Sequence, residues 1–283
     1  MSKPPTSNID SMAVRVARAS KNINYQYFAD YIRSVKSGKT TLRVLDYGCG
    51  RGYVMRLIDL DGIDMLGVDN YIYDDLKRDA LFKQGRILAI ETDGKLPFED
   101  ASFDLIITQQ VFEHVENKEP VLDELRRVLK LDGIMLHHIP TKDIVFEGHL
   151  KIPLYHWFSK GKLRDAFTYL MLLLGFGEKR NLFGSKRQWI ENQNKLMDSG
   201  YVHYEKSAYF RRNFEDHFVI TPRELEYMRY RASKSQRWIL LRLFDIKILQ
   251  PFFVALFRRL AFHAFELRFL PREKGSESVE STL

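Results

Sequence analysis

The sequence predicts an α/β fold, namely a doubly wound, mostly parallel sheet with an irregular insert and a helical C-terminal extension. Three observations predict it. Short apolar runs alternate with helical segments between residues 42 and 139. The runs are apolar throughout rather than at every second position, which is typical of parallel strands buried on both faces. A glycine-rich turn follows the first run, where open α/β sheets bind their ligands.

The elements follow in order along the chain. A spacing of four between apolar and aromatic residues predicts a helix over 9–36. The expected strands of the regular part are 42–46, 63–69, 86–91, 103–108 and 133–139, and its expected helices are 53–60, 74–83 and 119–129. Beyond Pro140 we expect helices at 162–174 and 186–198, a strand from Tyr201 to Phe210 paired with 216–220, and helices from Pro222 to about Leu270.

We divide the chain into five parts on this pattern. They are an N-terminal helical segment (1–36), an α/β core (37–140), a substrate-side insert with the end of the sheet (141–220), a basic and apolar helical extension (221–274) and a disordered tail (275–283). The hydrophobic content of 45% excludes wholesale disorder. One cysteine excludes a disulfide framework and a cysteine-rich zinc site. We find no secretory signal or membrane-spanning stretch and expect a cytoplasmic protein.

The net charge of +7 is concentrated in one region. Residues 221–274 hold twelve Lys/Arg against five acids, so the rest of the chain is neutral. A local basic excess indicates a local anionic partner. Residues 237–270 are also rich in Leu, Phe and Ile, so this stretch can lie on the inner membrane surface as a peripheral contact, pack on the core or form a homodimer face. Nucleic acid is an unlikely partner for so apolar a region.

The turn after the first strand carries the functional argument. Gly48, Gly50 and Gly52 stand at alternate positions, and glycine lets a ligand come against the backbone. The spacing differs from the pyrophosphate-binding G-x-G-x-x-G, and no Gly-Lys-Ser/Thr follows. Asp46 precedes the turn and can accept hydrogen bonds from a ligand ammonium group, while Asp69 ends the second strand where a ribose-binding carboxylate is expected.

These segments resemble a known family. Residues 44–52 resemble motif I of the class I S-adenosylmethionine-dependent methyltransferases, which have a Rossmann-like fold. Residues 67–69, 93–104, 111–115 and 125–133 resemble further segments of the small-molecule branch, in the same order. The resemblance implies S-adenosyl-L-methionine as cofactor. It implies that Asp46, Gly48, Gly50 and Gly52 hold the methionyl part, that Asp69 binds the ribose, that Asp93 meets the adenine amino group and that Gln109 lies near the sulfonium. Asn70 and Gly94 are further cofactor-binding candidates.

Histidines and one glutamate are the catalytic candidates. A hydroxyl acceptor needs a base to take its proton, and histidine suits neutral pH. Glu113 and His114 follow the fourth strand at the binding edge. His149 and His156 lie in the next loop, 147–158, which we interpret as a substrate wall, a lid or a packed loop. His137 and His138 lie inside a strand, where a structural role is expected. A metal held by Glu113, His149 and His156 is conceivable, but their spacing does not require it, and we predict none.

The sequence therefore predicts a methyltransferase acting on a small or lipid-linked acceptor. The loop around His149 and His156 is similar to segments of methyltransferases of bacterial surface-polysaccharide synthesis, which implies O-methylation of a sugar hydroxyl. Two alternatives stay open. One is methylation of a quinone or another lipid, and the other is a catalytically silent, nucleoside-binding regulatory protein.

Overall fold

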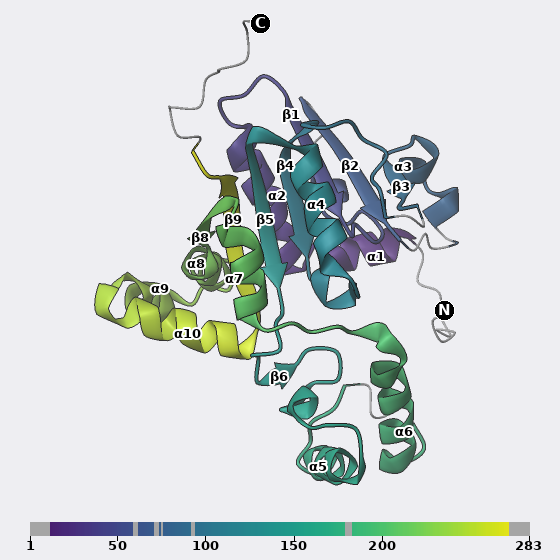
Figure 1. Cartoon of the computed structure of the whole chain (residues 1–283). Helices are drawn as coiled ribbons and strands as arrows, with labels where there is room; N and C mark the ends of the chain where they lie inside the picture. Colours follow the sequence, from purple (N-terminus) through teal and green to yellow (C-terminus); the bar gives the residue numbers. More distant parts are fainter. Residues whose placement is uncertain are drawn as a thin grey trace, which may run out of the picture.

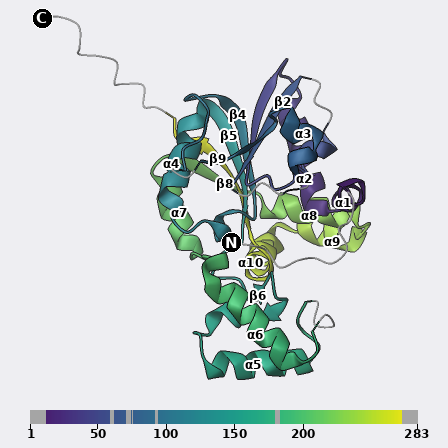
Figure 2. The same cartoon turned by 90° about the vertical axis from the view of Figure 1, so that its right-hand side faces the viewer.

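The computed structural model describes residues 12–58, 62–70, 74, 76–91, 94–178 and 183–271. Helices cover both faces of a seven-stranded sheet, and a smaller lobe made by the insert projects from one end of it (Figures 1 and 2). The strands of the sheet are β1 (Leu42–Tyr47), β2 (Ile63–Asp69), β3 (Ile87–Ala89), β4 (Phe103–Gln109), β5 (Leu129–Ile139), β8 (Phe218–Pro222) and β9 (His263–Phe269).

The sheet has the strand order β3-β2-β1-β4-β5-β9-β8. Neighbours from β3 to β5 pair in parallel, and β9 runs antiparallel to both β5 and β8. The chain moves outward from β1 to β3 and then returns to place β4 on the other side of β1. A ligand crevice is expected at such a reversal, beyond the carboxyl ends of β1 and β4. The predicted doubly wound, mostly parallel fold is confirmed.

Ten α-helices surround the sheet or build the lobe in the described part of the chain. They are α1 (Met12–Ala19), α2 (Ile23–Lys36), α3 (Ala80–Lys83), α4 (Lys118–Val128), α5 (Lys162–Leu173), α6 (Lys186–Leu196), α7 (Ser207–Glu215), α8 (Glu224–Lys234), α9 (Trp238–Asp245) and α10 (Gln250–Leu260). Helices α2 and α8 bury Phe28 and Tyr227 on one face of the sheet. Helices α4 and α7 bury Leu125 and Phe214 on the other face (Figure 2).

The insert lobe has a core of its own. It contains a two-stranded ribbon, β6 (Phe146–Glu147) and β7 (Ile152–Pro153), together with α5 and α6. Tyr155 and Trp189 are buried between these elements. Arg164 makes two hydrogen bonds to the Asp198 carboxylate, at 2.9 and 2.8 Å, and its guanidinium lies over the Tyr155 ring. A separate core and an ion pair made by the buried Arg164 give the lobe a fixed shape beside the sheet.

Several predicted elements differ in the structure. Among the described residues of the helix expected at 53–60, Met55–Leu57 form one 3₁₀ turn. The described residues of 74–83 hold a 3₁₀ turn, Leu76–Arg78, before the short α3. Residues 202–206 have no regular structure and lead into α7, so the strand expected from Tyr201 to Phe210 is wrong. The predicted tail 275–283 and residues 1–11 lie outside the described residues.

The end of the predicted C-terminal helix is also wrong, because residues 263–269 form β9. Ala264 faces the core under α2 and α8, whereas Phe265 and Leu267 face the core under α4 and α7. Both faces of the strand are therefore buried, and the resulting apolar run carries no period that separates a strand from a buried helix. The basic extension is helical up to Leu260.

His137 and His138 occupy the middle of β5 and are fully buried. The His137 ring packs between Phe112, Phe214 and Phe265, and the His138 ring contacts aromatic side chains on the opposite face. Burial lowers the pKa of each imidazole to about 3, so both are neutral. These rings are packing groups, as the sequence predicts.

Glu266 joins the last strand to α2. Its buried carboxylate accepts hydrogen bonds from Tyr31, Arg223 and Arg268. Burial alone would raise the pKa of Glu266, but these hydrogen bonds outweigh it and hold the pKa below its usual value. The ionised form is therefore favoured in the folded protein.

We predict that Glu266→Gln lowers the free energy of unfolding at pH 7 by about 2–3 kcal/mol, because it leaves charged partners of a buried group uncompensated. Urea denaturation measures this loss. The difference from wild type should shrink as the pH falls through the folded pKa of Glu266, since its stabilising effect needs the carboxylate. Glu215→Gln, at an exposed pair with Arg211, is the control and should change stability by less than about 0.5 kcal/mol.

Candidate functional site

A pocket of about 430 Å³ lies beyond the carboxyl ends of β1 and β4. The glycine turn forms one side of it, the segment after β4 a second, and the insert a third. The predicted site residues that line it are Asp46, Gly48, Gly50, Gln109, Glu113, His114 and His149. Its position is the one expected from the reversal of strand order, and its volume suits a nucleoside-sized ligand and a small partner.

The glycine turn follows β1 directly. Gly48, Gly50 and Gly52 all have positive φ, at 75°, 56° and 66°. A Cβ atom on Gly48 would lie 2.4 Å from Cγ2 of Val111, so only glycine fits there. A Cβ on Gly50 would meet nothing within 4 Å, so at this position the backbone conformation, rather than crowding, requires glycine. The turn therefore presents bare backbone to the pocket.

Two carboxylates flank the turn. Asp69, at the end of β2, accepts a hydrogen bond from the backbone nitrogen of Gly50 at 2.8 Å. Asp46 is buried, and burial together with the nearby Asp69 charge raises the pKa of Asp46 to about 7. A cation bound beside Asp46 would favour its ionised form. The Oε1 atom of Gln109 is buried and has no hydrogen-bond partner among the described residues. Bare backbone, a buried carboxylate and an unpartnered oxygen fit a ligand with an ammonium and a sulfonium group.

Other predicted cofactor residues lie around the pocket rather than in its wall. Gly52, Asp69, Asn70 and Gly94 are described but do not line it. Asp93 lies outside the described residues. The roles assigned to these residues stay predictions. Cys49 is buried with its Sγ against Gly67, where an added Cβ would lie 2.7 Å away, so it fills space in the turn.

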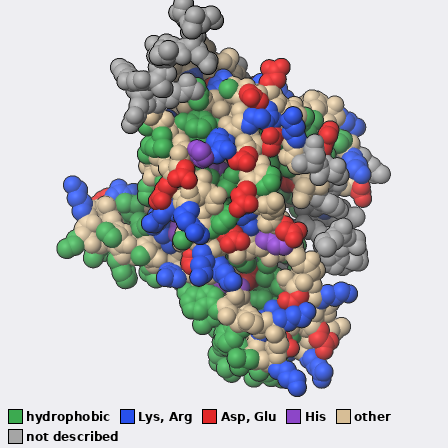
Figure 3. All heavy atoms as spheres, viewed as in Figure 1, with side chains coloured by type: hydrophobic (Ala, Val, Ile, Leu, Met, Phe, Trp, Pro, Cys, Tyr) green, Lys and Arg blue, Asp and Glu red, His purple; other side chains and the backbone are tan. Residues whose placement is uncertain are grey.

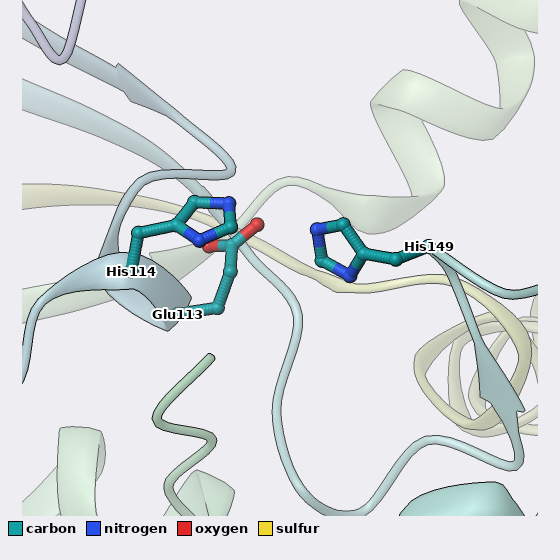
Figure 4. Close-up of side chains that lie close together, drawn as sticks. All are labelled: Glu113, His114 and His149. Atoms are coloured by element: carbon teal, nitrogen blue, oxygen red, sulfur yellow. The ribbon is translucent and has the colours of Figure 1, made fainter. Parts of the chain in front are cut away.

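Glu113, His114 and His149 converge on the other side of the pocket (Figure 4). Glu113 and His114 belong to a 3₁₀ turn, Phe112–His114, that follows β4, and His149 comes from the loop after β6. One carboxylate oxygen and one nitrogen of each ring lie within 4.8 Å of one another. Side chains from two segments 35 positions apart in the sequence thus form one polar cluster.

His149 is oriented by a buried carboxylate. Its Nδ1 donates to Oε1 of Glu147 at 2.8 Å, and the Tyr204 hydroxyl donates to the same oxygen at 2.8 Å. Burial alone would raise the pKa of Glu147, but the hydrogen bonds from His149, Leu150 and Tyr204 outweigh it, and the net pKa is lowered. An ionised Glu147 fixes the tautomer with the proton on Nδ1. The Nε2 atom of His149 then carries the lone pair and faces Glu113 (Figure 4).

His114 and Glu113 are held by the segment before α7. Nδ1 of His114 donates to the carbonyl oxygen of Tyr201 at 2.8 Å, which leaves the lone pair of the neutral ring on Nε2. The backbone nitrogen of His203 donates to the carbonyl oxygen of Glu113 at 2.6 Å. The Glu113 side chain is 2% exposed, and burial raises its pKa to about 8. Its Oε2 has no hydrogen-bond partner among the described residues.

His156, the remaining catalytic candidate, does not line the pocket. Its Nε2 donates to the carbonyl oxygen of Lys142 at 3.2 Å, and its ring lies 5.4 Å from the ring of Tyr204. Tyr204 and Tyr25 do line the pocket, and the sequence analysis missed both. No local pattern identifies either residue, because Tyr25 reaches the pocket from α2 and Tyr204 from an irregular segment.

Comparison with known proteins agrees with this geometry. A family model described as a methyltransferase domain matches residues 45–137. A probable S-adenosylmethionine-dependent methyltransferase of Mycobacterium tuberculosis is 26% identical over 183 residues, which are 61% of this chain and 65% of that protein. The ubiquinone/menaquinone biosynthesis C-methyltransferase UbiE of Xylella fastidiosa is 33% identical over 44% of this chain and 49% of that protein. The chain thus spans 65% and 49% of the lengths of these two relatives.

A solved structure of an S-adenosylmethionine-dependent methyltransferase from Mesorhizobium loti covers 88% of this chain and 99% of its own, at 14% identity and a TM-score of 0.49. The matched family segment runs from β1 to β5 and contains the glycine turn, Gln109, Glu113 and His114. It is the part of the chain whose strand order and bare-backbone turn build the pocket. Through this α/β core, residues 45–137, the chain matches a methyltransferase domain, and its relatives include probable S-adenosylmethionine-dependent methyltransferases.

Proposed function

We propose that the protein transfers a methyl group from S-adenosylmethionine to a hydroxyl group of a small or lipid-linked acceptor, with a sugar hydroxyl as the favoured acceptor. The observation that carries this proposal is the single pocket that joins the glycine turn to the Glu113–His114–His149 cluster. One side suits the cofactor and the other offers groups that can bind a polar acceptor and take its proton.

Each side of the pocket has a distinct role. Asp46 and the backbone at Gly48 and Gly50 hold the methionyl part, and the cofactor supplies the electrophilic methyl group. Displacement at that methyl group needs an in-line nucleophile, so orientation contributes much of the catalysis. The Glu113–His114–His149 cluster holds the acceptor hydroxyl and removes its proton. The insert lobe, which contributes His149, closes the acceptor side and reduces access of water.

The acceptor side is rich in polar groups. Gln110, Glu113, His114, His149 and Lys151 line it, and such a surface suits an acceptor with several hydroxyl groups. The relative named UbiE acts in ubiquinone/menaquinone biosynthesis, so a quinone or another lipid is the second candidate. A catalytically silent protein would bind the cofactor without transferring its methyl group.

Exposed apolar side chains support a lipid-linked acceptor. Trp238, Ile239, Ile248 and Phe252 on the α9–α10 segment are 62–84% exposed. Leu163, Leu170 and Leu173 on α5 are also exposed. Figure 3 shows hydrophobic side chains on the insert lobe and on the projecting α9–α10 segment, with Lys and Arg beside them. Residues 238–260 hold four Lys/Arg against one acid. Apolar groups beside cations suit an anionic lipid surface. No helix in the described part of the chain is long and apolar enough to cross a membrane.

The cofactor side is tested with Asp69→Ala. We expect the dissociation constant of S-adenosylhomocysteine, measured by calorimetry, to rise about 10–100-fold, because a charged hydrogen-bond acceptor for the ribose is lost. Asp69→Asn keeps an oxygen for the Gly50 nitrogen and separates the loss of charge from a disturbed turn. Asp64→Ala, exposed on the same strand, is the matched control. Unchanged affinity in both Asp69 variants would contradict the ribose placement.

The acceptor side is tested with His149→Ala and His114→Ala. Methyl incorporation from radiolabelled cofactor is measured in the lipid, glycan, protein and RNA fractions of a cell extract. We expect the rate to fall about 10²–10⁴-fold while S-adenosylhomocysteine affinity is kept. His217→Ala, an exposed histidine, should have no effect. Equal losses of rate and affinity would show a role in binding or folding instead. Tight cofactor binding without any incorporation by the wild type would favour the silent protein.

The lipid surface is tested by cosedimentation with vesicles. The wild type should bind vesicles that contain phosphatidylglycerol more tightly than vesicles of phosphatidylcholine alone. Ile248→Asp combined with Phe252→Asp should weaken this binding by at least ten-fold, because both apolar contacts are lost. Leu131→Asp, exposed at the start of β5, is the control. Two results would overturn this surface as a lipid contact. One is that the wild type binds no vesicles, and the other is that the wild type and the control are dimers whereas the double variant is a monomer.

A further inference from the structure

We propose that Glu113, His114 and His149 bind a divalent first-row transition-metal ion. One carboxylate oxygen and one nitrogen from each of two imidazole rings lie within 4.8 Å of one another in the pocket wall. Two histidines and a carboxylate are a donor set that holds Zn²⁺, Fe²⁺, Co²⁺ or Mn²⁺ with further positions open to a substrate or water.

The state of the donor atoms supports the proposal. The Nδ1 atoms of His114 and His149 both donate to oxygens, those of Tyr201 and Glu147. In the neutral form of each ring the lone pair is therefore on Nε2, and Figure 4 shows the His149 ring directing this end toward the Glu113 carboxylate. Metal-binding histidines have this arrangement, in which an oxygen behind the ring fixes its tautomer and orientation.

Glu113 provides the second, independent observation. Its side chain is 2% exposed, yet its Oε2 has no hydrogen-bond partner in the described part of the chain. A buried carboxylate oxygen without a partner is costly. An ion between Glu113 and the two rings would give the carboxylate a partner. The unpartnered Glu113 oxygen therefore points to a bound ligand. Packing or structural hydrogen bonding does not account for it.

The cluster needs only a small contraction to hold an ion. Donors at ~2.1 Å from a tetrahedral metal lie roughly 3.4 Å apart. The three donor atoms now lie within 4.8 Å of one another. To bind an ion, the side chains would therefore have to move by about 1–1.5 Å. The backbones of the three residues are anchored, because His203 binds the carbonyl of Glu113 and the neighbouring Leu150 nitrogen binds Glu147. Rotation of the side chains can bring the donors together without moving the turn.

Such an ion would change how the acceptor loses its proton. A metal-bound Nε2 has no lone pair for a proton, so His149 cannot be both a ligand and the base. A hydroxyl oxygen bound at an open position of the ion has a lowered pKa and becomes a nucleophile near neutral pH. Its proton goes to solvent or to a buffer base. This step rests on the proposed methyl transfer, whereas metal binding itself rests only on the three side chains.

The metal-free full-length protein is titrated with Co²⁺ and followed by visible absorption. We expect one equivalent to bind and to give the intensified visible absorption of four- or five-coordinate Co²⁺, and Zn²⁺ should remove it. Glu113→Gln, His114→Ala and His149→Ala should each weaken binding by at least ten-fold. His217→Ala, at an exposed histidine, is the matched control and should bind as the wild type does.

Glu147→Gln gives a further test, since it keeps all three ligands and changes only the group behind His149. Binding should weaken about 10–100-fold. Absence of the cobalt signal in the wild type, or a signal that the His114 and His149 variants retain, would overturn the proposal. Calorimetry with S-adenosylhomocysteine on the metal-free protein separates the two proposals. Cofactor binding and methyl transfer without metal binding would refute only the metal site, whereas metal binding without cofactor binding would refute only the proposed function.

Discussion

The parallel pairing of β1 with β4 is the constraint on which the site depends. Because the chain returns past β1 after β3, the loops that leave β1 and β4 diverge, and a crevice forms between them. The loop from β1 supplies the bare-backbone turn at Gly48 and Gly50. The end of β4 supplies Gln109, and the turn after it supplies Glu113. A side chain at Gly48 would collide with Val111 of the second loop. The two loops are thus fitted to each other as well as to a ligand.

The acceptor side depends on contacts between segments far apart in the chain. His114 and Glu113 bind the backbone of residues 201 and 203, and the buried Lys118 ammonium donates to the carbonyl oxygens of Val115 and His203. This clamp places Tyr204 against Glu147, which in turn orients His149. The insert lobe, with its separate core, is therefore connected to the sheet at the place where an acceptor would bind. A substitution in this clamp would therefore shift His149 even though the substituted residue does not contact His149.

Much of the fold and half of the site could be predicted from local pattern. Buried parallel strands are continuous apolar runs, and the alternate glycines after β1 predict the turn that lines the pocket. The rest depends on tertiary contacts. Residues 263–269 were predicted as helix because a strand buried on both faces shows no period. The position of Tyr204 depends on the clamp, and the isolation of Glu113 Oε2 depends on what surrounds it. Neither property can be predicted from the residues that neighbour it in the sequence.

Buried glutamates show how the same residue type can serve stability or chemistry. Glu266 has three hydrogen-bonding side chains around it, and Glu147 has His149, Tyr204 and a backbone nitrogen. Glu224, whose Oε2 is unpartnered among the described residues, still pairs with Arg258 through Oε1. Glu113 instead lines the pocket beside two oriented imidazoles, and the Lys118 charge is its cationic neighbour. Burial outweighs this neighbour and raises the pKa of Glu113 to about 8, so a cation bound in the pocket would favour the ionised form of Glu113.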